Sequence, residues 1–364
     1  MLFQLLDSYL KSDQRPRLVR KIYCLVLRIL SALYLCGYWI RKSLYQTGLL
    51  RPVRVNIPVI SVGNLTWGGT GKTPLVIYLA LCLEKSGQRV VILTRGYKRK
   101  TKEQIILDQK NLKAMNWQKC GDEPYLICQS LQNTAVVINA KRSKAARWAE
   151  ENLKPDVFIL DDGFQHWKLH RDLEIVLIDS QNPFGNGRLQ PLGILREPLE
   201  ALSRADLVIL SKVSGREISA ELHQKVSSYY RGETLQTKYK LSSIRELETG
   251  QEFVLSDLKR KKLLAFCGIG NPDSFYSLLE QSELRVGKKL SFPDHYSYDK
   301  FDFLTLEKEG LKIGADYLAT TAKDRLKIPA NLQLQLPLLI FEIEVEVISG
   351  ERVLWQQIEQ ILQK

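Results

Sequence analysis

The feature that most constrains the fold is a glycine-rich turn that directly follows an apolar, β-branched run at residues 57–62. The turn ends in the triplet Gly-Lys-Thr and consists of Thr66, Trp67, Gly68, Gly69, Thr70, Gly71, Lys72 and Thr73. After it, the leucine spacing in residues 75–83 is typical of a helix. A strand, a glycine-rich turn and a helix in this order predict a phosphate-binding loop, in which backbone N–H groups and the helix N-terminus bind a nucleotide's phosphates.

Two side chains of this loop have expected roles of their own. Lys72 is expected to reach the β- and γ-phosphates, and the Thr73 hydroxyl to ligate Mg²⁺. The usual pattern has its first glycine at the position of Thr66, which is a departure from the motif. A glycine-rich turn with an incidental lysine is the alternative, but the flanking strand and helix patterns favour a nucleotide site.

A second apolar run, residues 157–160, ends in the acidic pair Asp161 and Asp162. It predicts a buried parallel strand that places carboxylates at the sheet edge where ligands bind in open α/β folds. A carboxylate there can hold Mg²⁺ directly or through water. His166 and His170 follow with helical spacing, but a zinc site is not expected because no third ligand has suitable spacing.

Composition limits the classes of partner. The chain has 364 residues, 45% of them hydrophobic, which suits a soluble enzyme of two or three domains. A net charge of +13 favours nucleic acid, an anionic membrane or a phosphorylated substrate as partner. Nucleic acid is not expected, because the sequence has no zinc-finger pattern, RNP motif or long Lys/Arg block. Six cysteines without a C-x-x-C pair indicate reduced thiols in a cytosol-facing protein.

The N-terminal region is apolar from residue 18 to residue 40, with basic residues inside and around it. A full membrane span needs about 20 apolar residues, and Arg28 interrupts the candidate window. An interfacial helix fits better, and a helix buried in the core is the alternative. The expected membrane-facing stripe consists of Leu25, Ile29, Ala32, Leu33 and Cys36.

The remaining pattern alternates strands and helices, which predicts an α/β fold. We expect a P-loop NTPase-like domain with a parallel sheet, a second and smaller α/β domain, and an N-terminal membrane-associated helix. The expected boundaries are 1–50 for the membrane-interfacial segment, 51–237 for the P-loop kinase domain, 238–256 for a two-stranded linker, and 257–364 for the C-terminal domain.

Further short motifs occur in a fixed order along the chain. They are SVGNLT (61–66), GGTGKTP (68–74), TRGY (94–97), GDEP (121–124), DDGFQH (161–166), FGNGRL (184–189), LREP (195–198), GIGNP (268–272), FPDH (292–295) and TAKD (321–324). In this combination the chain resembles the tetraacyldisaccharide 4′-kinase family, which phosphorylates a membrane-embedded glucosamine disaccharide in lipid A synthesis. The family does not require a glycine where this chain has Thr66.

The resemblance implies a phosphoryl-transfer site with ATP and Mg²⁺ as cofactors. It implies that Asp161 or Asp162, together with Glu123, completes the metal shell begun by Thr73. Asp122 accepts the proton of the sugar 4′-hydroxyl, with His295 from the second domain in support. The residues expected to bind the acceptor or to stabilise the transition-state charge are Arg142, Gln165, His166, Arg188 and Arg196.

The resemblance also implies the partners and the location. The acceptor is a tetraacyl-disaccharide 1-phosphate, which becomes lipid IVA. The protein is expected to act as a monomer on an anionic membrane surface, at the cytoplasmic face of the bacterial inner membrane, as a peripheral or monotopic protein. A membrane-associated ATPase of the partitioning type is the alternative, but its signature lysine would occupy the position of Trp67. A GTPase is not expected, since the sequence lacks the N-K-x-D motif with which GTPases recognise guanine.

Overall fold

The computed structural model describes residues 17–213, 218–330 and 332–363, and side chains from residue 21 onward. The start of the expected N-terminal segment, residues 1–16, therefore lies outside the described part.

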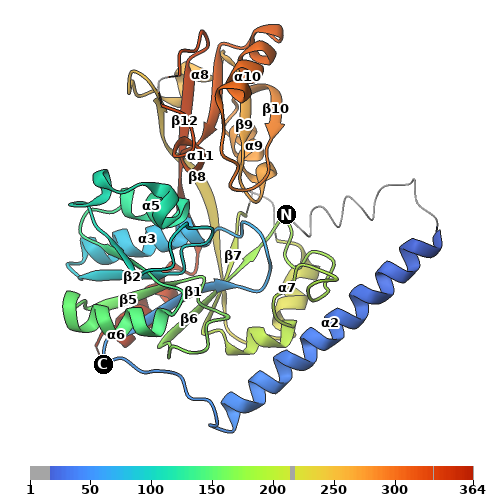
Figure 1. Ribbon diagram of the computed structural model, residues 1–364, viewed down its shortest axis with the longest axis vertical. Coiled ribbons are helices and arrows are strands. Elements are labelled where there is room, and N and C mark those ends of the chain that lie inside the picture. The colour runs from blue at the N-terminus through green and yellow to red at the C-terminus, as the bar shows by residue number, and fades with distance from the viewer. Residues whose placement is uncertain (1–16, 214–217, 331, 364) are drawn as a thin grey trace.

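A single sheet runs through the whole molecule (Figure 1). Among the described residues it has 12 strands, in the order β10-β9-β11-β12-β8-β7-β6-β1-β5-β2-β4-β3. The strands are β1 (Val59–Asn64), β2 (Val90–Thr94), β3 (Ile105–Leu107), β4 (Ala135–Ile138), β5 (Val157–Asp161), β6 (Leu173–Asp179), β7 (Leu207–Ser211), β8 (Thr234–Glu246), β9 (Lys262–Cys267), β10 (Arg285–Ser291), β11 (Tyr317–Thr321) and β12 (Leu338–Ser349).

Helices cover the sheet and fill the connections between strands. They are α2 (Arg17–Gln46), α3 (Lys72–Lys85), α4 (Trp117–Cys120), α5 (Asp122–Gln129), α6 (Arg142–Leu153), α7 (Ala220–Ser227), α8 (Leu255–Leu258), α9 (Pro272–Gln281), α10 (Lys300–Lys312), α11 (Ala322–Arg325) and α12 (Glu351–Leu362), with 3₁₀ turns η1 (Leu112–Ala114) and η2 (Leu199–Arg204).

The N-terminal part of the sheet positions the candidate nucleotide loop. Strands β7, β6, β1, β5, β2 and β4 are parallel, and apolar clusters pack on both faces. Strands β1 and β5 are buried along their whole length, as their apolar sequences require. Their carboxyl ends lie side by side, so the loops after Asn64 and Asp161 meet at one edge. The α/β fold with a mainly parallel sheet is confirmed.

The connection between the two parts of the sheet is formed by β8, which overlaps the segment 238–256 expected as a two-stranded linker. Strand β8 begins beside β7 and then pairs antiparallel with β12 over most of its length. A short local pairing is also present: Arg245 bridges Glu252, and the N–H groups of Glu246 and Phe253 donate to the carbonyls of Gln251 and Ile244 at 2.9 Å. The long partner strand of β8 therefore comes from a distant part of the sequence, which a local pattern cannot reveal.

The C-terminal helix returns to the first part of the molecule. On α12, the side chains of Leu354, Ile358 and Ile361 belong to the apolar cluster around β1 and α3. The expected division at residue 257 assigned this helix to the second domain. Its amphipathic pattern predicts a helix, but not which of two cores receives its apolar face.

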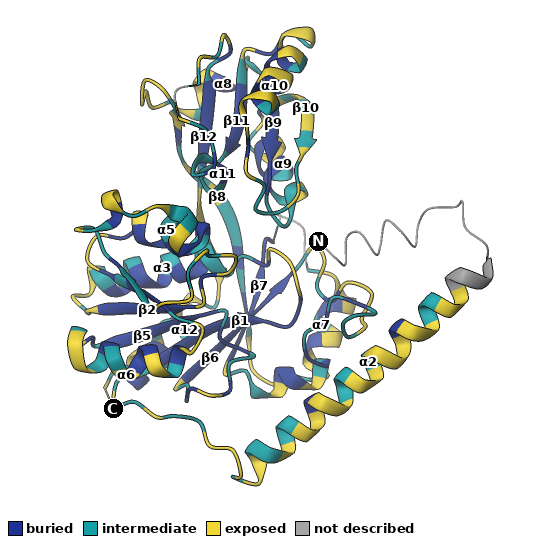
Figure 2. Ribbon diagram, in the orientation of Figure 1, coloured by how far each residue is buried: buried dark blue, intermediate teal, exposed yellow. Residues whose placement is uncertain are grey.

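Helix α2 lies along one side of the body and is largely exposed (Figure 2). Each residue of the expected membrane-facing stripe is exposed, for example Ile29 at 52% and Leu33 at 62%. The opposite side of α2 contacts the body through Tyr34, which donates to the carbonyl of Arg196 at 2.6 Å, and through the buried Tyr38. Residues 21–46 are long and apolar enough to cross a membrane. A helix buried in the core, the alternative considered from the sequence, does not describe this arrangement.

Candidate functional site

A cavity of about 1300 Å³ lies between the two parts of the sheet. Its walls come from the glycine-rich loop, the ends of β2 and β5, the first turns of α5 and α6, and the loops after β9, β10 and β11. Tyr34 and Arg41 of α2 also line it. A cavity of this size and mixed lining can hold a nucleotide and part of a second substrate together.

The glycine-rich loop turns tightly into the first residue of α3. Gly71 has φ 95° immediately before α3, and a Cβ at this position would collide with the hydroxyl of Tyr239. The Asn64 amide donates to the carbonyl of Thr66 at 2.7 Å and to Thr70 Oγ1 at 2.9 Å, which fixes the turn. Lys72 therefore stands at the N-terminus of a 14-residue helix, where an anion is favoured.

Lys72 points to the end of β5. Its Nζ lies 3.4 Å from Asp162 Oδ1 and donates to Asn64 Oδ1 at 3.1 Å. Arg196 donates to both oxygens of Asp162, at 2.8 and 2.9 Å. Burial alone would raise the pKa of Asp162, but Lys72 and Arg196 outweigh burial and hold it below its ordinary value. Asp162 is therefore a carboxylate already neutralised by two cations.

Asp161 is in the opposite electrostatic situation. It is buried and accepts a hydrogen bond from Thr94 Oγ1 at 2.8 Å. Burial, followed by the negative charges of Glu123 and Asp162, raises the pKa of Asp161 to about 7. Within the described residues, no group of three or more His, Cys, Asp or Glu side chains is arranged to hold a metal ion by itself. A nucleotide-bound Mg²⁺ needs fewer protein ligands, because phosphates and waters fill the other positions.

This raised pKa leads to a prediction about stability. Between pH 4 and 7 the unfolded chain releases a proton that folded Asp161 keeps, so ionising this group costs folding free energy as the pH rises. In the absence of nucleotide and Mg²⁺, Asp161→Asn should raise the free energy of unfolding by on the order of 2 kcal/mol at pH 8 and by less at pH 5. Denaturant unfolding at the two pH values measures this. Equal shifts at both would contradict the electrostatic explanation.

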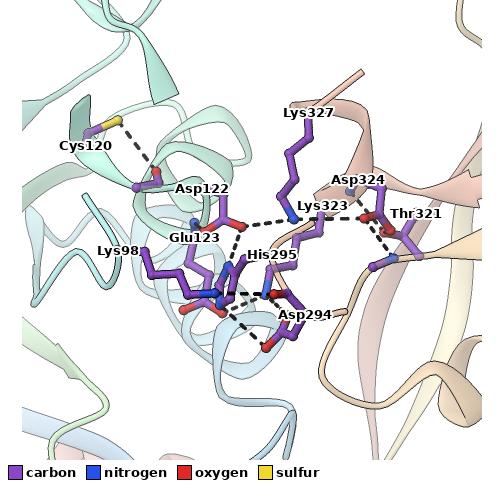
Figure 3. Close-up of polar contacts among 12 residues, drawn as sticks. Lys98, Cys120, Asp122, Glu123, Asp294, His295, Thr321, Lys323, Asp324 and Lys327 are labelled. Atoms are coloured by element: carbon purple, nitrogen blue, oxygen red, sulfur yellow. Dashed lines mark hydrogen bonds and ion pairs between the residues drawn. The ribbon is translucent and has the colours of Figure 1, made fainter. Parts of the chain in front are cut away.

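Asp122, at the start of α5, contacts His295, which follows β10 in the second part of the sheet (Figure 3). His295 Nδ1 lies 2.7 Å from Asp122 Oδ2. Asp122 is 4% exposed and is the first residue of α5, where its Oδ1 accepts the N–H of Glu123 at 2.9 Å. Burial would raise the pKa of Asp122, but the bond to His295 and the ammonium groups of Lys323 and Lys327 hold it well below its ordinary value.

Glu123 is engaged by a lysine from the second part of the sheet. Lys323 Nζ lies 3.0 Å from Glu123 Oε1 and 3.4 Å from Asp294 Oδ1. Burial would lower the pKa of Lys323, but Glu123 and Asp294 outweigh it and raise that pKa. This ion pair engages one oxygen of the carboxylate that the sequence suggested as a metal ligand, so Lys323 competes with a metal ion for Glu123.

The expected substrate-binding residues fall into two groups. Arg142, Gln165, His166 and Arg196 line the cavity. Burial, and then the charges of Arg142 and other cations, lowers the pKa of His166 to about 3, so this imidazole is neutral. Arg188 is exposed on the loop after β6 and does not line the cavity, so the structure does not bring it to the other four.

Several cavity residues were not anticipated from the sequence. Lys212 follows β7 at the same sheet edge, pairs with Asp179 at 2.5 Å and also donates to the carbonyl of Gly69. Its position after an apolar strand could have revealed it, by the same reasoning that found Asp161. Tyr239 lies on the linker strand β8, and only the fold brings it to Gly71.

Comparisons with known proteins agree on one family. The family model described as tetraacyldisaccharide-1-P 4′-kinase matches residues 23–363. The tetraacyldisaccharide 4′-kinase of Halothermothrix orenii is 39% identical over 341 residues, covering 88% of each chain. That of Aquifex aeolicus is 41% identical over 293 residues, covering 79% of this chain and 84% of the relative. A crystal structure of LpxK from Aquifex aeolicus in complex with ATP superimposes with a TM-score of 0.74 at 34% identity, covering 93% of this chain and 99% of the other.

Proposed function

The chain belongs to the tetraacyldisaccharide-1-P 4′-kinase family, and we propose that it transfers the γ-phosphate of ATP to the 4′-hydroxyl of a tetraacyl-disaccharide 1-phosphate, which forms lipid IVA. The observation that carries the proposal is the cavity itself. The glycine-rich loop, Lys72 and His295 all line it. A nucleotide bound at the loop and a group that accepts a proton would therefore lie in the same cavity. A kinase needs this juxtaposition, because its catalysis rests on positioning and charge neutralisation.

On the nucleotide side, the N–H groups of residues 68–73 and the Lys72 ammonium would bind the phosphates. The Thr73 hydroxyl and the Asp161 carboxylate fit Mg²⁺, since Asp161 is buried beside other acids and a cation would stabilise its ionised form. Bound Mg²⁺ would supply charge neutralisation on the transferred phosphoryl group. Asp162 would hold Lys72 and Arg196 in place by its ion pairs with both.

On the acceptor side, Asp122 and His295 would together remove the proton of the 4′-hydroxyl. Arg142 and Arg196 would stabilise negative charge on the acceptor or in the transition state. Burial lowers the pKa of Arg142 to about 10, which still leaves a cation at neutral pH. Gln165 and His166 line the same wall and offer uncharged hydrogen-bonding groups to a sugar.

Helix α2 supports a membrane-embedded acceptor. Its inward side reaches the cavity through Tyr34 and Arg41, while its outward side exposes apolar residues. An acyl chain can therefore stay in the bilayer while the sugar enters the site. We propose that α2 binds an anionic surface at the cytoplasmic face of the inner membrane. Since every group named above comes from one chain, a monomer suffices for the reaction.

The defining experiment uses purified full-length protein in detergent with γ-labelled ATP, Mg²⁺ and a tetraacyl-disaccharide 1-phosphate. Label is expected in the lipid, at the 4′-position, and ATP hydrolysis without lipid should be much slower. A partitioning-type ATPase would hydrolyse ATP without lipid and label no lipid, which would overturn the proposal.

A second prediction concerns the outward face of α2. Replacing Ile29 and Leu33 together by aspartate should reduce the bound fraction on anionic vesicles at least about tenfold, because two apolar anchors are lost and two negative charges are added. Vesicle sedimentation measures the bound fraction. Adding the same charges at the exposed polar positions Ser43 and Gln46 is the matched control and should release much less protein. Equal release by both variants would contradict a specific apolar contact.

A further inference from the structure

We propose that Trp167 is a positioning residue for the lipid acceptor. It joins helix α2 to the segment 162–168, so that the helix proposed to contact the membrane also holds the wall of the cavity at which the sugar of the acceptor binds. The inference rests on the proposed kinase function and gives α2 a second role, beyond attachment to the membrane.

The indole of Trp167 is enclosed by cations and aromatic rings from two other elements, and the residue is 6% exposed. The guanidinium of Arg41, on α2, lies 4.7 Å from the ring centroid, and that of Arg204, on η2, lies 4.5 Å from it. Tyr38 and Tyr45 of α2 pack edge-on against the same ring, with centroids 5.8 and 5.4 Å away. Three residues of one helix therefore contact this side chain, and a guanidinium over a buried indole is a favourable contact.

Trp167 lies behind the wall of the cavity. Gln165, His166 and Lys168 line the cavity, whereas Trp167 does not. Because Trp167 lies between these residues in the chain, its contacts on the α2 side also fix the backbone of the residues on the cavity side. The turn before it is tight, since the N–H of His166 donates to the carbonyl of Gly163 at 2.7 Å. A displacement of the indole is therefore transmitted to the cavity wall.

Arg41 connects the same helix to the wall a second time. Its guanidinium donates to the carbonyl of Gln165 at 2.9 Å, and Arg41 itself lines the cavity. The side chain of Gln165 is held from the other direction: its Nε2 donates to the carbonyl of Asn64 at 3.0 Å, and its Oε1 accepts from Arg196 at 3.3 Å. The position of Gln165 thus depends on the end of β1, on the loop before η2 and on α2.

The attachment of α2 to the body does not depend on Trp167 alone. The Tyr34 hydroxyl donates to the carbonyl of Arg196 at 2.6 Å, and the Ser31 hydroxyl donates to that of Leu189 at 3.1 Å. The apolar stripe expected to face the membrane is exposed and takes no part in these contacts. Removing the indole should therefore leave α2 docked and able to bind a membrane, but loosen the wall that the indole holds.

The kinetic test separates positioning from attachment. Trp167→Leu should raise the KM for the lipid acceptor about tenfold, because the contact of the indole with two buried cations is lost. The kcat, the KM for ATP and the bound fraction on anionic vesicles should stay within about threefold. Trp167→Phe keeps an aromatic ring between the two guanidinium groups and should recover most of the loss. An unchanged acceptor KM in Trp167→Leu would overturn the proposal. A loss of vesicle binding in proportion to the rise in KM would overturn it too, since Trp167 would then only attach the helix.

Amide hydrogen exchange of the full-length protein in detergent tests the coupling without turnover. Arg41→Met removes the cation of α2 that contacts Trp167, so the amides of residues 163–170 should exchange at least about fivefold faster. Lys42→Met is the matched control, because it removes the same charge from the next residue, whose ammonium lies 4.7 Å from the ring of Trp39 within α2. It should leave these amides unchanged. Equal exchange in the two variants would overturn the inference even if the protein is an active lipid kinase. Conversely, a negative lipid assay would refute the proposed function and leave this difference in exchange in place.

Discussion

Lys72→Ala is expected to lower kcat/KM for phosphoryl transfer by about 10³-fold or more, because it removes the cation that we propose binds the β- and γ-phosphates. The fold should survive. The turn is held by Asn64 and the glycine conformations, and Asp162 keeps its two hydrogen bonds from Arg196 when Lys72 is lost. Initial rates with labelled ATP, together with a thermal melt of the variant, measure both expectations.

The same helix offers the control for this experiment. Lys85 lies in the last turn of α3 and is exposed, so Lys85→Ala removes the same charge and leaves the loop untouched. It should retain turnover within about twofold. Turnover of Lys72→Ala close to that of the Lys85 variant would contradict the role of the loop. A large drop in melting temperature of Lys72→Ala alone would show that Lys72 is needed for folding.

Local sequence patterns were sufficient to predict those parts of the site that are formed by residues close together in the sequence. The glycine-rich loop, the start of α3 and the carboxylates after β5 all follow from strand and helix periodicity and from the edge rule for parallel sheets. Asp161 and Asp162 were identified as a pair, but their sequence could not show that one is neutralised and the other is not. That difference depends on Lys72 and Arg196, which approach from other elements.

Long-range pairing limited the prediction elsewhere. The partner of β8 is β12, about 100 residues further along the chain, and α12 packs on a core formed at the other end of the sequence. Lys327 illustrates the same limit within the site. Its sequence surroundings resemble an exposed basic turn, and only the fold buries it beside Asp122. Contacts of this kind carry no local periodicity, so a single sequence does not specify them.

The second large effect concerns the Asp122–His295 pair, which the fold brings together from positions 173 residues apart. Asp122→Asn and His295→Gln should each lower kcat about 10²- to 10⁴-fold, the usual contribution of a positioned acid–base group, and leave the KM for ATP within about threefold. The double variant should be no slower than the slower single variant. When two groups act as one unit, removing either of them already abolishes their joint function.

The relative size of the two single effects tests the order within the pair. If His295 Nε2 accepts the proton, His295→Gln should be at least as slow as Asp122→Asn, which removes only the partner at Nδ1. A full double-mutant cycle of kcat at saturating ATP measures both quantities, with thermal melts to exclude unfolding. Losses that multiply in the double variant would mean that the residues act independently, and His295 would then be better assigned to binding the acceptor. A much smaller loss for His295→Gln than for Asp122→Asn would mean that Asp122 accepts the proton and that His295 only orients it.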